Sequence, residues 1–169
     1  RKRNKTIKRK SLETLAKAIG YGAIKFHIIK VSPEKNVTFD WKQALSFEGE
    51  TGPYVQYTHA RLKSILRKAR QEKRNIDYSL LNSEDEKAII SLLADFPNAA
   101  KKALDSLKPH FLATYLIILS EKLNEFYHKH PVLKSKQEVR QARLALIRGV
   151  AQVLKTGLNL LGIEAPERM

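Results

Sequence analysis

Apolar side chains recur at helical spacing along most of this chain, and start and stop signals separate the runs. The first run begins at Ser11 and ends at Ser32 and Pro33, with an interruption expected at Gly20 and Gly22. No stretch shows the strict apolar and polar alternation that a half-buried strand requires. The pattern predicts an all-α fold: a helical bundle with a short irregular N-terminal region.

Capping residues, prolines and glycines divide the remaining chain into further helices. The first is a brief helix opened by Asp40 with Gln43 as capping partner, and the second runs from Pro53 to about Gln71. The third is opened by a capping box of Ser83 and Glu86 and ended by Pro97, and a short fourth helix runs from Asn98 to Leu107. The fifth runs from Pro109 to just before Pro131, and the last is opened by a capping box of Ser135 and Glu138 and stopped by Gly162.

The chain is strongly basic, with 32 Lys and Arg against 17 Asp and Glu, a net charge of +15. Such an excess favours a polyanionic partner. Seven of the basic residues lie in residues 1–10, which we expect to form a mobile basic arm or linker. The longest wholly apolar run covers only residues 116–119, so we expect no membrane span. The chain opens without an apolar signal segment, and we expect a cytoplasmic protein.

No pattern of residues indicates catalysis or metal binding. The chain has no cysteine, which excludes thiol catalysis and Cys-ligated zinc. His128 and His130 are two residues apart and therefore on different faces of a helix, which makes them poor zinc ligands. A segment from Gly149 resembles a phosphate-binding loop, but Leu154 replaces the second glycine and no strand precedes it. We predict no catalytic residue and no metal site.

The helix expected from Pro53 carries two stripes of side chains. One is apolar and belongs to the core, whereas the other combines aromatic and basic residues roughly 110° away. Aromatic rings beside cations suit unpaired bases, since rings stack on bases and cations hold phosphates. On the stripe alone, tyrosines at the rim of a core beside solvated basic residues remain an equal alternative. The second stripe consists of Tyr54, Tyr57, Arg61 and Lys68.

Ordered blocks from about Leu12 to the C-terminus resemble arginyl-tRNA synthetases. The early blocks resemble the end of the catalytic region, and the later ones resemble the anticodon-binding domain that follows it. The blocks cover residues 19–26, 31–35, 39–41, 44–49, 51–61, 124–127, 132–133, 142–146 and 153–169.

The resemblance implies the C-terminal part of a class I synthetase that joins arginine to its tRNA with ATP. Its bundle is of the DALR type and holds the anticodon loop. In the family, tyrosines and an arginine at the start of the first bundle helix face the anticodon. By motif these are Tyr54, Tyr57 and Arg61, joined by Tyr127 before the valine–leucine turn and by the chain-terminal Met169, which implies a docked rather than a frayed tail.

Composition sets apart the arm or linker at 1–10, and the same resemblance implies two regions after it: the end of the catalytic region at 11–52 and the anticodon-binding bundle at 53–169. The HIGH- and KMSK-type ATP signatures are missing. We therefore expect an inactive fragment that holds no cofactor, with ATP and Mg²⁺ bound by a catalytic domain upstream. The expected partner is tRNA of the arginine isoacceptors, and we expect a monomer.

Two alternatives to this interpretation exist. The chain could be a stand-alone basic helical RNA-binding paralogue without catalytic activity, or a helical protein–protein adaptor whose charge only keeps it soluble. The adaptor does not explain the order of the matching blocks. Residues 40–49 favour the fragment over the paralogue, because a synthetase junction has no obvious use in a free-standing bundle.

Overall fold

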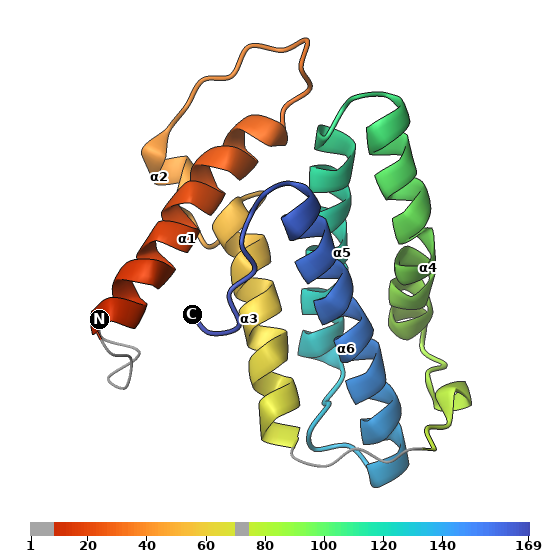
Figure 1. The fold of residues 1–169 in the computed structure, drawn as a ribbon. Helices are drawn as coiled ribbons and strands as arrows, with labels where there is room; N and C mark the ends of the chain where they lie inside the picture. The colour runs from red at the N-terminus through yellow and green to blue at the C-terminus, as the bar shows by residue number, and fades with distance from the viewer. Residues whose placement is uncertain (1–8, 70–74) are drawn as a thin grey trace.

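The computed structural model describes residues 9–69 and 75–169, and all regular structure in these residues is helical (Figure 1). The predicted all-α fold is confirmed. Residues 1–8 of the expected arm and the expected end of a helix near Gln71 lie outside the described residues. The elements are α1 (Arg9–Ile29), α2 (Trp41–Ala44), α3 (Gly52–Ala69), the 3₁₀-helix η1 (Tyr78–Leu80), α4 (Glu84–Asp105), α5 (His110–Lys129) and α6 (Gln137–Leu160).

Helices α5 and α6 form the centre of the bundle, with α3 on one side, α4 on the other, and α1 across the outer side of α3 (Figure 1). Each large apolar side chain buried there contributes roughly 1.5–3 kcal/mol relative to exposure. None of the described helices is long and apolar enough to cross a membrane. The largest fully buried side chains of the two central helices are Leu116, Leu119, Leu123, Phe126, Leu144, Ile147, Leu154 and Leu158.

The expected interruption at Gly20 and Gly22 is wrong, since α1 continues through both residues. Gly22 instead allows α1 and α3 to approach closely. A Cβ atom added to Gly22 would lie 2.7 Å from Nε2 of Gln56 on α3, and one added to Gly52 would lie 2.7 Å from the carbonyl oxygen of Gly22. Packing between the helices therefore outweighs the low helix propensity of glycine, and the irregular part of the N-terminal region lies in residues 30–51, around α2.

The expected break at Pro97 is also wrong, because α4 continues to Asp105. Proline removes one helical hydrogen bond and costs about 3 kcal/mol in a helix interior. Packing against α5 offsets that cost: the hydroxyl of Tyr115 donates to the carbonyl of Leu92 at 2.7 Å, and its ring lies 5.7 Å from that of Phe96. Asn98 starts no new helix and donates its side-chain amide to Asp95.

Of the three predicted capping pairs, Asp40 accepts the backbone N–H of Gln43 at the start of α2, and Ser83 with Glu86 forms a full box. Ser83 accepts the backbone N–H of Glu86 at 3.2 Å, and the Glu86 carboxylate accepts the N–H of Ser83 at 3.0 Å. The box predicted at Ser135 is wrong, since α6 begins at Gln137 without a side-chain cap. The hydroxyl of Ser135 donates instead to the carbonyl of Pro131.

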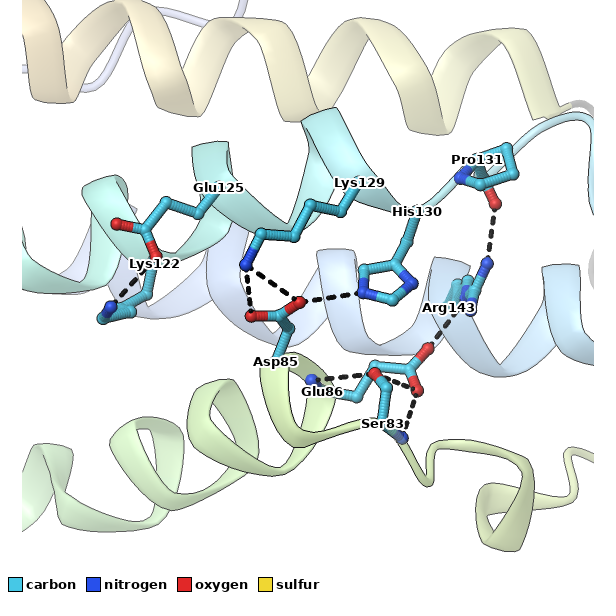
Figure 2. Close-up of polar contacts among 9 residues, drawn as sticks. All are labelled: Ser83, Asp85, Glu86, Lys122, Glu125, Lys129, His130, Pro131 and Arg143. Atoms are coloured by element: carbon cyan, nitrogen blue, oxygen red, sulfur yellow. Dashed lines mark hydrogen bonds and ion pairs between the residues drawn. The ribbon is translucent and has the colours of Figure 1, made fainter.

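A polar cluster ties the start of α4 to the end of α5 and to α6 (Figure 2). The carboxylate of Asp85 pairs with His130 at 2.9 Å and Lys129 at 3.1 Å. The buried carboxylate of Glu86 accepts from Nε of Arg143 at 2.7 Å. Burial opposes ionisation of Glu86, but the hydrogen bonds from Arg143 and Ser83 outweigh it and lower the pKa of this carboxyl.

Candidate nucleic-acid interface

The start of α3 is fixed by Thr51, which caps the helix that carries most of the candidate residues. Its hydroxyl accepts the backbone N–H of Tyr54 at 3.1 Å and donates to the carbonyl of Ser46 at 2.6 Å. Pro53 lies in the first turn, where the missing N–H costs no helical hydrogen bond. The cap thus fixes where α3 begins, and with it the direction in which the aromatic and basic stripe faces.

Three of the predicted residues meet where α3 faces α5. The guanidinium carbon of Arg61 lies 4.4 Å from the ring centroid of Tyr127, close enough for a cation–π interaction. Between the helices, the side-chain amide of Asn124 donates to the hydroxyl of Tyr54 at 2.8 Å and accepts from Nη1 of Arg61 at 3.3 Å. Asn124 was not among the predicted site residues, although it lies three residues before Tyr127 and so shares its helix face.

Tyr57 is the most accessible predicted aromatic residue, with 42% of its surface exposed. Its ring packs edge-to-face against that of Phe47 at 6.2 Å, and Phe47 is 49% exposed. Phe47 comes from the segment before α3 and was not predicted. Lys68 is exposed on α3, about 10 Å further along the helix axis than Arg61.

The C-terminal tail docks, as the resemblance implied. Gly162 has a φ of +67°, a left-handed conformation that suits glycine at a helix end. The N–H of Ile163 donates to the carbonyl of Leu158 at 2.9 Å, and that of Gly162 to Asn159 at 2.9 Å. Ile163 is buried. These contacts turn the chain back from α6 onto α3 (Figure 1).

The tail is held by side chains on a different face of α3. Gln56 donates to the carbonyl of Glu164 at 2.8 Å, and Nδ1 of His59 lies 2.9 Å from the carbonyl of Pro166. Lys63 pairs with Glu167 at 3.1 Å. At about 100° per residue, this face is centred roughly 180° from Tyr54 and Arg61, on the opposite side of the helix. Met169, at the end of the tail, is partly buried, and its contact with RNA stays a prediction.

The buried imidazole of His59 is held in its neutral form. A carbonyl oxygen only accepts hydrogen bonds, so Nδ1 carries the proton that it donates to Pro166. Burial lowers the pKa of His59 and outweighs the hydrogen bond to Pro166, while the charge of Lys63 acts in the same direction as burial.

Acidification is therefore expected to destabilise the docked tail. His59 takes up a proton near pH 6.5 when unfolded and only at lower pH when folded, so its contribution is present above about pH 6.5 and lost below it. The loss is at most about 1.4 kcal/mol per pH unit. The free energy of unfolding should differ less between pH 7.5 and pH 5.5 in His59→Gln than in the unchanged protein. An equal difference would contradict this assignment.

The described residues contain neither a cluster of metal ligands nor a phosphate-binding loop. Among residues 9–69 and 75–169, no group of three or more His, Asp or Glu side chains is placed to hold a metal ion. The segment that resembles a phosphate-binding loop, from Gly149 to Thr156, lies inside α6. Its backbone N–H groups are engaged in the helix, so it cannot cradle a phosphate.

Comparisons with known proteins identify related chains. Residues 55–169 match the family model of the DALR anticodon binding domain. Arginine–tRNA ligases from Clostridium botulinum and Thermococcus kodakarensis are 48% and 42% identical over 93% and 99% of this chain, which covers 28% and 27% of those proteins. An arginyl-tRNA synthetase structure from Thermus thermophilus superposes with a TM-score of 0.91 at 42% identity, over 98% of this chain and 29% of that one. The chain thus spans less than a third of the length of these relatives.

Proposed function

This chain belongs to the DALR anticodon-binding domain family, and we propose from this that it binds the anticodon loop of arginine tRNAs as part of an arginine–tRNA ligase. In that role it positions the tRNA for a catalytic portion outside this chain, which binds ATP and Mg²⁺. The chain alone attaches no arginine, and it acts in the cytoplasm as a monomer. The proposed RNA contacts are Tyr54, Tyr57, Arg61, Lys68, Tyr127 and Met169.

The observation that carries the proposal is the pairing of Arg61 with Tyr127 beside the exposed ring of Tyr57. Unpaired bases of an RNA loop stack on aromatic rings and on guanidinium planes. The arrangement supplies both kinds of surface, and helix packing between α3 and α5 fixes their spacing. The net charge of +15 supplies the attraction for phosphates.

The test compares two RNAs: an arginine tRNA and the same tRNA with its central anticodon base changed. We expect the unchanged protein to prefer the first in a fluorescence anisotropy titration. Tyr57→Ala should weaken cognate binding roughly ten-fold, since a stacking ring contributes about 1–3 kcal/mol per base. Tyr78→Ala is the matched control, because Tyr78 is an exposed tyrosine on η1, across the bundle from α3 (Figure 1).

Two results would contradict the proposal. One is equal affinity of the unchanged protein for the two RNAs, which would mean that the anticodon is not bound. The other is equal weakening by Tyr57→Ala and Tyr78→Ala, which would mean that Tyr57 on α3 does not contact a base.

A further inference from the structure

We propose that Asn124 is the positioning residue of this surface. Its side-chain amide holds Tyr54 and Arg61 in place before RNA binds, and the RNA itself contacts those two residues. The inference rests on the proposed function and concerns how the same site achieves its specificity.

The amide of Asn124 bridges α3 and α5 with both of its ends. Its Oδ1 accepts from Nη1 of Arg61 at 3.3 Å, and its Nδ2 donates to the hydroxyl of Tyr54 at 2.8 Å. Nδ2 also lies 3.4 Å from Oγ1 of Thr58, near the limit of a hydrogen bond. One neutral side chain thus contacts two of the proposed RNA-binding residues, which lie 63 and 70 residues away in sequence.

Its neighbours leave the amide only one orientation. Arg61 has only donors, so the carbonyl oxygen of Asn124 must face it. The hydroxyl of Thr58 donates to the backbone carbonyl of Tyr54 at 2.9 Å and can therefore only accept from Asn124. Both constraints agree, and the NH₂ group faces Tyr54 and Thr58.

This orientation leaves the groups that RNA needs available. Asn124 engages Arg61 through Nη1 of the guanidinium, whose carbon lies 4.4 Å from the centroid of the Tyr127 ring. A guanidinium plane is one of the surfaces on which an RNA base can stack. Tyr54 accepts the hydrogen bond from Asn124, so its own O–H proton remains to donate to an acceptor on the RNA.

Only a side chain that both donates and accepts can do this at residue 124. Asn124→Asp keeps the acceptor for Arg61 but removes the donor to Tyr54. Asn124→Leu keeps a similar volume and removes both hydrogen bonds. Asn98→Leu is the matched control, because Asn98 is exposed on α4 and bonds only to the neighbouring Asp95 among the described residues.

The experiment measures the affinity ratio between the cognate arginine tRNA and the tRNA with the changed central base. We expect Asn124→Leu and Asn124→Asp to reduce this ratio roughly ten-fold, with helix content by circular dichroism and the salt dependence of binding unchanged. Asn98→Leu should keep the full ratio. Because Asn124 acts through both Arg61 and Tyr54, adding Asn124→Leu to a variant that already carries Arg61→Ala and Tyr54→Phe should cause little further loss.

A spectroscopic readout separates positioning from a merely structural role. Burial raises the pKa of Tyr54, and the hydrogen bond from Asn124 opposes that rise. In Asn124→Leu the Tyr54 phenol should therefore titrate at higher pH than in the unchanged protein. An NMR titration of tyrosine-labelled protein, with Tyr54→Phe to assign the signal, measures this directly.

The possible failures are distinguishable. An unchanged protein that does not discriminate between the RNAs overturns the proposed function and this inference together. Discrimination by the unchanged protein that survives in Asn124→Leu overturns the inference alone. A full further loss from Asn124→Leu in the variant with Arg61→Ala and Tyr54→Phe, or an unmoved Tyr54 titration, also overturns it.

Discussion

Arg143→Met is expected to lower the free energy of unfolding by about 3–5 kcal/mol, the usual cost of leaving a buried charge unpaired. The side chain of Glu86 is 1% exposed, and its carboxylate lies 2.7 Å from Nε of Arg143. Arg143 also donates to the carbonyl of Pro131 at 2.9 Å (Figure 2), and it donates to Ser135 at 3.1 Å. Its loss therefore affects α4, α6 and the segment between α5 and α6 at once.

Urea unfolding followed by circular dichroism at pH 7 measures the change. Glu86→Gln combined with Arg143→Met should recover part of the loss, because no unpaired charge then remains buried. Lys101→Met is the control: it breaks an exposed pair with Asp105 and should cost about 0.5 kcal/mol or less. A cost below about 1 kcal/mol for Arg143→Met would show that water reaches Glu86 and that the ion pair does not hold the helices.

The ion pair of Glu86 and Arg143 also determines how the free energy of unfolding changes on acidification. The folded pKa of Glu86 is lowered, so its contribution is present above its unfolded pKa and lost as the pH falls through the folded pKa. In Arg143→Met this carboxyl loses its main partner and is expected to bind a proton at higher pH. The destabilisation caused by the substitution should therefore shrink on acidification.

The elements predicted correctly from the sequence are those whose signals are local. The capping box of Ser83 and Glu86 and the glycine stop at Gly162 each depend on residues within six positions, and both form. Ser135 has a similar local signal, yet its hydroxyl bonds to Pro131 and Arg143 instead. Pro131 lies before the helix and Arg143 eight residues further along, and neither belongs to the four-residue pattern that defines a capping box.

In the candidate site, too, the features that depend on local spacing were predicted, whereas those that depend on packing between helices were not. The helical period was sufficient to place Tyr54, Tyr57 and Arg61 on one stripe of α3. It could not show that Asn124 joins Tyr54 to Arg61, because that contact depends on how α5 packs against α3. Phe47 escaped prediction for a related reason, since an irregular segment has no period that fixes its direction.

Affinity for tRNA is expected to fall about a thousand-fold between 50 and 200 mM salt if the chain neutralises about six phosphates. Several lysines already pair with neighbouring acids, as Lys87 does with Glu84 and Lys122 with Glu125. Exposed basic residues near the site, such as Lys68, are better placed to replace counterions. The log–log slope of affinity against salt, from anisotropy titrations, measures how many such contacts form.

Two variants should separate phosphate contacts from base contacts. Lys68→Ala is expected to reduce the slope by about 0.7–0.9 and to weaken cognate and changed tRNAs alike, because phosphates carry no sequence information. Tyr57→Ala is expected to weaken binding while leaving the slope unchanged, because stacking releases no counterion. Lys87→Ala, which breaks an exposed pair on α4, is the control and should alter neither quantity. Equal affinity at both salt concentrations would mean that the excess positive charge does not contact RNA, which would favour the adaptor.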